Sequence, residues 1–411
     1  MSANTEEVIQ VSQPSLLSLF WIFIKIGSTA FGGFMALISV VKNYLVDREK
    51  LLTDDDMLDG ISLATILPGP VAVNVVAYAG YRIRGISGAI ICATAVILPS
   101  FLLILFLSYA YFTYGEIPAV NNIFKGILPA VAAIIVATSI NMGRKALSGY
   151  IEVSIAILAM LTLIFIGGFY STLIIIFSSG FIGWILFKKK LTSSQSPDVR
   201  LEVLDSTLKS ERNITSLFSL AGAGILVFII TLVKSQTYIA AKLLATFAGM
   251  SVLLFGGGFV FIPLIQESVV ETYQWVTHRE FIDAIAMGQI TPGPILISAT
   301  FIGYKVAGVI GAATATIGIF APPAMIMLIC THYLQKLKKS QNINAVLKGV
   351  RCAVIGMIAA AAYVVSMSAE TSLISVVIFI AAIIALLKFK LEVVWIIPAS
   401  GIVGLLAFSY T

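Results

Sequence analysis

Long apolar runs recur along the chain, and they constrain its fold more than any other feature. Runs near residues 16–41, 86–112 and 119–143 each exceed the roughly 20 residues that a helix needs to cross a bilayer. Of all residues, 59% are hydrophobic and only 11% are charged. Lipid cannot satisfy backbone polar groups, so such segments span membranes as helices. The sequence therefore predicts an all-α polytopic membrane protein.

The apolar runs form two sets of six spans with one extra span between them, so we expect about 13 transmembrane helices. A polar, Ser-rich stretch at 191–213 reads as a linker between the two sets. The expected organisation is a cytoplasmic tail at 1–15, a first transporter repeat at 16–190, a cytoplasmic linker at 191–213, a connecting helix at 214–235 and a second transporter repeat at 236–411.

A Pro-Gly-Pro tripeptide stands inside an apolar run in each half, as Pro68-Gly69-Pro70 and as Pro292-Gly293-Pro294. Proline removes a backbone donor and glycine permits unusual dihedral angles, so each tripeptide predicts a broken helix at membrane depth. A break there must be buried in protein or line a hydrated cavity. The alternative is that each tripeptide only kinks its helix.

The two tripeptides belong to a longer internal repeat. Phe31-Gly32-Gly33 and Phe255-Gly256-Gly257, Asp59 and Asp283, and the tripeptides themselves are all separated by the same interval in the sequence. After a gap of a single position, matched residues such as Arg82 and Lys305, or Lys125-Gly126 and Lys348-Gly349, continue the register. A register kept over this length indicates a duplicated fold.

An odd span between two six-span units predicts that the halves insert with opposite orientation, as inverted repeats. Lys and Arg residues concentrate in loops on one predicted side, which favours a cytoplasmic N terminus and an outside C terminus. If the tripeptides formed re-entrant loops instead, the Lys336–Lys339 cluster would lie opposite the Lys188–Lys190 cluster. We therefore favour segments that cross the membrane.

These motifs, in two ordered copies with a six-plus-one-plus-six layout, resemble the chromate ion transporter family in its long, two-domain form. The likeness covers the chain apart from the N-terminal tail and the linker. It implies a multi-pass protein of the cytoplasmic (inner) membrane that exports chromate, and also sulfate as a dianion of the same shape. We also expect no cofactor. We expect no nucleic-acid partner, because the basic residues lie mainly in short loops between apolar spans, where they set orientation; a homodimer stays open.

A dianion that leaves water needs fixed donors, and free backbone N–H groups at a helix N terminus supply them together with the macrodipole. Each tripeptide break could create such a terminus, and nearby side chains could add donors. The residues expected to bind substrate are Lys25, Phe31, Gly32, Gly33, Pro68, Gly69, Pro70, Asn74, Phe255, Gly256, Gly257, Gly258, Thr291, Pro292, Gly293, Pro294 and Ser298.

Charged residues in or beside the spans have two interpretations each. Lys25 either attracts substrate or extends its ammonium group to the cytoplasmic surface. Arg82 and Lys305 either form anion-concentrating vestibules or set the topology, and Lys125, Lys348 and Arg351 fit extension to the surface. Asp59 and Asp283 either carry protons or complement helix dipoles.

Two rival classes remain. A membrane enzyme is disfavoured because the sequence has no metal-ligand motif, nucleophile elbow or phosphate loop. A carrier of another solute on the same scaffold is the stronger rival, and the scarcity of acids deep within the spans favours an anion over a cation.

Overall fold

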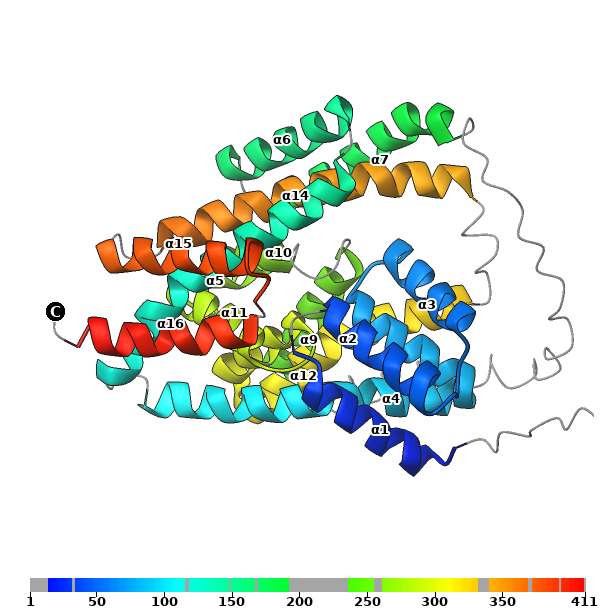
Figure 1. The fold of residues 1–411 in the computed structure, drawn as a ribbon, viewed down its shortest axis with the longest axis horizontal. Coiled ribbons are helices and arrows are strands. Elements are labelled where there is room, and N and C mark those ends of the chain that lie inside the picture. The colour runs from blue at the N-terminus through cyan, green and yellow to red at the C-terminus, as the bar shows by residue number, and fades with distance from the viewer. Residues whose placement is uncertain are drawn as a thin grey trace, which may run out of the picture.

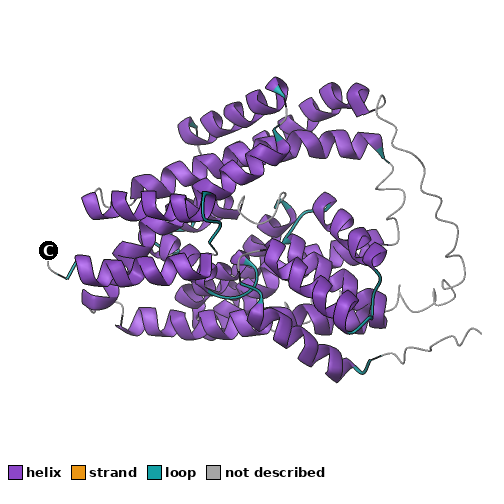
Figure 2. Ribbon diagram, in the orientation of Figure 1, coloured by secondary structure: helices purple, strands orange, loops and turns teal. Residues whose placement is uncertain are grey.

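The computed structural model describes residues 14–31, 34–114, 118–147, 149–166, 169–191, 236–254, 261–331, 340–368, 372–391 and 393–409. Every regular element in these ranges is a helix (Figure 2). The predicted connecting helix, most of the linker and most of the N-terminal tail lie outside the described residues.

The helices of the two halves follow the same order. The first half contains α1 (Leu16–Thr29), α2 (Phe34–Lys42), the π-helical turn η1 (Asn43–Arg48), α3 (Asp54–Ile66), α4 (Val71–Tyr114), α5 (Pro118–Ala146), α6 (Tyr150–Phe165) and α7 (Phe169–Leu191). The second contains α9 (Gln236–Val252), α10 (Phe261–Gln266), the π-helical turn η2 (Glu267–Thr272), α11 (His278–Ile290), the short 3₁₀ helix η3 (Ile295–Ile297), α12 (Ser298–Thr331), α14 (Gln341–Ser368), α15 (Leu373–Leu387) and α16 (Val393–Ala407).

Helix length and hydropathy support a multi-pass membrane protein. In the described ranges, five segments are long and apolar enough to cross a bilayer, and further apolar helices are shorter. The all-α class is therefore confirmed. The predicted total of 13 spans, which counts each tripeptide segment as one crossing, is not confirmed, and the predicted orientation stays a prediction.

Matched positions in the two halves adopt the same local geometry. Thr53 caps α3 and Thr277 caps α11, each through a capping box. Gly85 has φ of +63° within α4, and Gly308 has φ of +59° within α12. Only glycine adopts such angles readily, so both long helices bend sharply at these residues.

The helix breaks expected at the tripeptides are present, because α3 ends at Ile66 and α4 begins at Val71. The chain then folds back along itself instead of continuing. Arg82 Nη2 lies 2.6 Å from Asp56 Oδ1, although a continuous helix would separate these residues by about 39 Å. Gly60 faces the Tyr78 ring in the same hairpin.

The second half repeats this return, since Lys305 Nζ lies 2.8 Å from Glu280 Oε1. Each tripeptide is therefore the tip of a re-entrant hairpin, and our preference for crossing segments is wrong. The distribution of Lys and Arg favours crossing tripeptide segments only if all the other segments cross as well. Local patterns reveal where a helix breaks but not the direction in which the chain leaves the break.

The two sequence halves interleave in space. Helix α14 packs against α6 and α7 of the first half, and α5 packs against α15 and α16 of the second. Helices α4 and α12 also pack together. In Figure 1, α6, α7 and α14 lie along one edge of the molecule, while α1, α2 and α3 gather in another region. The packed bodies thus each contain elements of both halves.

Candidate functional site: the paired hairpin tips

The tip of each re-entrant hairpin contacts the other half of the chain. The N–H of Gly69 donates to the carbonyl of Leu254 at 2.5 Å, and the N–H of Gly293 donates to the carbonyl of Ala30 at 2.8 Å. Both pairs obey the repeat, because Ala30 and Leu254 are themselves matched positions of the two halves. Ala30 and Leu254, the residues that precede the two Phe-Gly-Gly segments, therefore each contact the tripeptide of the opposite half, a pairing that sequence order did not indicate.

The tip glycines are required by both conformation and space. Gly69 has φ of +104° and Gly293 has φ of +102°, a region that L side chains rarely adopt. A Cβ at Gly69 would overlap the ring of Pro323 in α12. At Gly293 it would come 2.7 Å from Ser100 Oγ, which donates to the Pro292 carbonyl.

Three polar side chains expected to bind substrate instead hydrogen-bond to nearby backbone. Asn74 Nδ2 donates to the Pro68 carbonyl at 3.1 Å, Thr291 Oγ1 to Gly288 at 3.1 Å, and Ser298 Oγ to Ile295 at 3.0 Å. All three are buried. The Thr and Ser protons are thus committed to the chain, so in this conformation these two residues stabilise the tips and offer no free donor.

Other predicted site residues are distributed around the tips. Phe31 is half-buried, and Pro68, Pro70, Pro292 and Pro294 belong to the tips themselves. Gly32, Gly33 and Phe255 to Gly258 lie outside the described residues. Lys25 is exposed on α1, opposite the face formed by Phe23 and Ile26.

The vestibule interpretation of Arg82 and Lys305 is weakened by their partners. Each cation forms a short ion pair with an acid at the start of its own hairpin, Asp56 or Glu280. Burial of Asp56 opposes its ionisation, but hydrogen bonds from Thr53 and the charge of Arg82 outweigh that effect and hold its pKa below the ordinary value. Both cations thus join the two helical arms of their hairpins at the end opposite the tip.

The matched acids Asp59 and Asp283 have different surroundings. Asp283 is fully buried, and its Oδ2 accepts a 2.7 Å hydrogen bond from the Tyr111 hydroxyl. Its Oδ1 has no hydrogen-bond partner among the described residues, and Arg279 Nε lies 3.9 Å from Oδ2. Asp59 is only half-buried. Neither acid lies in the first turn of its helix, so the helix-dipole interpretation fits Asp56 and Glu280 better.

The two hairpins are also covered unequally. Helix α11 packs against α5, α14 and α16, and Phe281 to Gly288 form a continuous buried stretch. The main contacts of α3 are with α4 and α12, and its Leu58 is 59% exposed. The matched residue in α11, Ile282, is 3% exposed. One flank of the first hairpin is therefore open where the corresponding flank of the second is closed.

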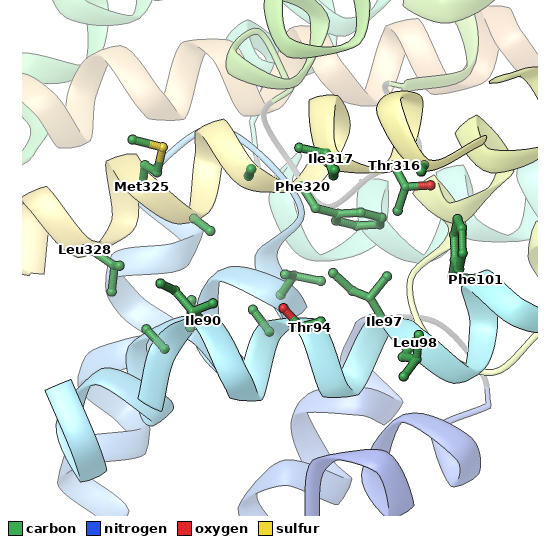
Figure 3. A pocket seen from close by; sticks show the side chains of 17 residues that line it. Ile90, Thr94, Ile97, Leu98, Phe101, Thr316, Ile317, Phe320, Met325 and Leu328 are labelled. Carbon is green, nitrogen blue, oxygen red and sulfur yellow. The ribbon is translucent and has the colours of Figure 1, made fainter. Parts of the chain in front are cut away.

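A cavity of about 380 Å³ lies between α4 and α12 (Figure 3). Figure 3 shows the helices running antiparallel, with Ile90 facing Leu328 and Phe101 facing Thr316. Its lining is almost entirely apolar. An unpaired dianion would lose its hydration there without compensation, so this cavity does not suit an oxyanion.

The helical architecture and the two re-entrant hairpins, each in contact with the opposite half, define a multi-pass membrane protein with paired broken helices. The chromate transporter family model matches residues 17–184 and 241–405. The chain belongs to this family. The starts of the two matched segments are offset by the same interval as the internal repeat.

Relatives of similar length support this assignment. The chain is 30% identical over 395 residues to an uncharacterized transporter of Methanocaldococcus jannaschii, covering 96% of this chain and 95% of the relative. It is 28% identical over 402 residues to the chromate transport protein of Cupriavidus metallidurans, covering 96% and 94%. It is 30% identical over 399 residues to the chromate transport protein of Pseudomonas aeruginosa, covering 95% and 92%. No solved structure matches the chain.

Proposed function

We propose that this protein is a secondary transporter that exports chromate, and also sulfate, across the cytoplasmic membrane by alternating access. Family membership supports the substrate class. The observation that carries the mechanism is the reciprocal pair of contacts in which Gly69 bonds to Leu254 and Gly293 bonds to Ala30, each in the opposite half. Export through this route would confer chromate resistance on a cell. The protein acts as a carrier and not as an enzyme.

The first tripeptide supports oxyanion binding at the tips. Helix α4 begins directly after Pro70, at Val71. The first N–H groups of a helix have no partner within it, and the helix dipole makes this end positive. The amide of Gly69 itself is already used by Leu254. We therefore assign the anion to the first turn of α4 and not to the glycine.

Unequal cover of the hairpins supports alternating access. The open flank of α3 and the covered flank of α11 are two environments for matched elements. Exchange of these environments would open the site first to one side and then to the other, as in inverted-repeat transporters. Because the halves interleave, the moving bodies are the tip-bearing helices and the surrounding helices α5–α7 and α14–α16, not the halves themselves.

Orientation remains as predicted from charge, with the N terminus cytoplasmic and the C terminus outside. The ends of α7 and α12 carry or precede the Lys188–Lys190 and Lys336–Lys339 clusters. If each Phe-Gly-Gly segment also returns to the membrane side from which it enters, the re-entrant tripeptide hairpins keep both lysine clusters on the cytoplasmic side. The positive-inside pattern is then preserved.

We assign proton coupling to Asp283. A fully buried carboxylate with one unpartnered oxygen is costly as an anion, so protonation relieves its burial. In Asp283→Asn, we expect substrate exchange to persist while transport loses its dependence on an imposed pH gradient. Asp59→Asn is the matched control. Equal pH-gradient dependence in wild type and Asp283→Asn would reject the assignment.

The function is tested by uptake of radiolabelled chromate and sulfate into inverted membrane vesicles containing the full chain. We expect saturable uptake that requires the protein and increases with an imposed gradient. A Gly69→Val variant of matched abundance should show none. Absence of uptake of either anion by the wild type would reject the substrate assignment and leave another anion as the alternative.

A further inference from the structure

Arg351 occupies an unusual position in helix α14. From residue 345 to residue 362 this helix is buried or half-buried at every position except Arg351, which is exposed. Helices α5, α6 and α7 pack around α14. Arg351 therefore lies at a position of α14 that the neighbouring helices leave uncovered.

This uncovered position of α14 adjoins the first hairpin tip. The Arg351 guanidinium donates from Nη2 to the carbonyl of Thr65 at 3.2 Å. Thr65 lies in the last turn of α3, shortly before Pro68, on the same face as the exposed Leu58. Arg351 therefore borders the open flank of α3 next to Pro68-Gly69-Pro70.

The charge of Arg351 has no carboxylate partner within the described part of the chain. Lys348, one turn earlier, differs in this respect because its Nζ lies 2.9 Å from the buried Glu152 Oε1. A guanidinium has five N–H donors, and the hydrogen bond to Thr65 uses one. An intramembrane cation that is not paired is expensive and typically lies on a substrate pathway.

The internal repeat supplies this cation once. In the register that matches Lys125 with Lys348, the first-half counterpart of Arg351 is Leu128, which is 9% exposed. The cation thus accompanies only the open hairpin. A planar guanidinium can donate two parallel hydrogen bonds to two oxygens of a tetrahedral oxyanion, which an ammonium cannot do.

We propose that Arg351 binds the transported tetrahedral oxyanion directly, beside the first turn of α4, and that Thr65 holds the guanidinium in place when the site is empty. This inference rests on the proposed function and adds the residue that supplies the positive charge of the anion-binding site. The competing explanation is structural, since an arginine at the carbonyl end of α3 also complements the helix dipole.

The test compares purified wild-type protein, Arg351→Gln and Arg351→Lys by two measurements: thermal stabilisation by chromate or sulfate, and the KM for uptake in inverted vesicles. We expect Arg351→Gln to lose at least ten-fold in anion affinity. Arg351→Lys should raise KM several-fold, because lysine keeps the positive charge but lacks the two parallel N–H donors of the guanidinium. A purely structural role predicts lower melting temperatures without anion and an unchanged KM.

Lys348→Gln is the matched control, because it breaks an ion pair on the same helix and should lower stability without a selective change in anion affinity. If Arg351→Gln does not fold, the KM of Arg351→Lys decides, and a wild-type value overturns the inference. Wild-type uptake with an unchanged KM in both Arg351 variants overturns the inference alone. Wild-type protein that neither binds nor transports an oxyanion overturns the proposed function as well.

Discussion

Gly69 and Gly85 differ in why glycine is required: backbone conformation alone at Gly85, and both conformation and lack of space at Gly69. Gly69 combines φ of +104° with close contact to Pro323, whereas Gly85 has φ of +63° and no described atom within 4 Å of the position a Cβ would occupy. Gly293 is intermediate, because its neighbour is the movable hydroxyl of Ser100. Substitution by alanine should therefore have graded effects.

We expect Gly69→Ala to be the most destabilising of the three, followed by Gly293→Ala and then Gly85→Ala. The left-handed backbone alone costs about 1–2 kcal/mol for alanine, and overlap with the Pro323 ring adds to that cost. The yield and melting temperature of the purified variants measure the order. Equal values for Gly69→Ala and Gly85→Ala would show that the contact with Pro323 is unimportant.

At this scale the sequence predicted the special glycines but not the roles of their polar neighbours. Asn74, Thr291 and Ser298 are near the tips as expected, yet their donors bond to adjacent carbonyls. Short polar side chains often bond to their own backbone, and sequence alone does not tell this use from ligand binding. Asp283 was predicted as one of a pair, but its burial depends on helices that lie far away in the sequence.

The re-entrant hairpin is the element that sequence reasoning misjudged. A usable signal was present, because Asp56 and Arg82 are equally distant from Gly69 in the sequence, and Glu280 and Lys305 are almost equally distant from Gly293. Opposite charges placed evenly about a helix break in both halves indicate a return of the chain. The observed ion pairs join these residues.

We expect Asp56, through its hydrogen bonds from Thr53 and its ion pair with Arg82, to stabilise the hairpin in a pH-dependent manner. The pKa of Asp56 is held below its ordinary value of 3.8, so the contribution is complete above that value and is lost as the pH falls through the lower folded-state pKa. The melting temperature of wild type should exceed that of Asp56→Asn at neutral pH, and the difference should shrink in strong acid.

The charge-reversed double variant Asp56→Arg/Arg82→Asp provides the control. It should recover part of the stability lost in each single reversal, because the two side chains are adjacent. Additive losses in the double variant would argue against the hairpin.

Close helix packing joins the interleaved halves through glycines. A Cβ on Gly349 of α14 would lie 2.7 Å from the Gly183 Cα of α7, and one on Gly126 of α5 would lie 2.6 Å from the Gly404 Cα of α16. Small residues allow such approach of membrane helices. These two contacts link each half to the other.

We expect Gly349→Val to destabilise the protein by about 1–3 kcal/mol or more, since the surrounding atoms are backbone and cannot move aside. Gly249→Ala on α9 is the control, because a Cβ there meets no atom of the described residues within 4 Å. Thermal unfolding in detergent measures both. A Gly349→Val variant as stable as Gly249→Ala would contradict the packing described.

At the scale of the whole molecule, the sequence predicted the membrane class and the duplication but not the interleaving. The constant interval between matched motifs reveals that two units are related. This interval carries no information on which helices of one unit pack against which helices of the other. Separate units and interleaved units would both bury the apolar surfaces of the helices. The unequal cover of α3 and α11 is likewise a property of the assembled bodies.

Alternating access is the central claim, and thiol accessibility at matched positions tests it most directly. In a background with Cys92, Cys330 and Cys352 replaced, Leu58→Cys and Ile282→Cys are each exposed to membrane-impermeant reagents applied from either side. Without substrate, we expect Leu58→Cys to react from the cytoplasmic side and Ile282→Cys to be protected. During chromate transport, reactivity at Leu58→Cys should fall and Ile282→Cys should become reactive from the outside. Reactivity that does not change at either position under transport conditions would contradict alternating access.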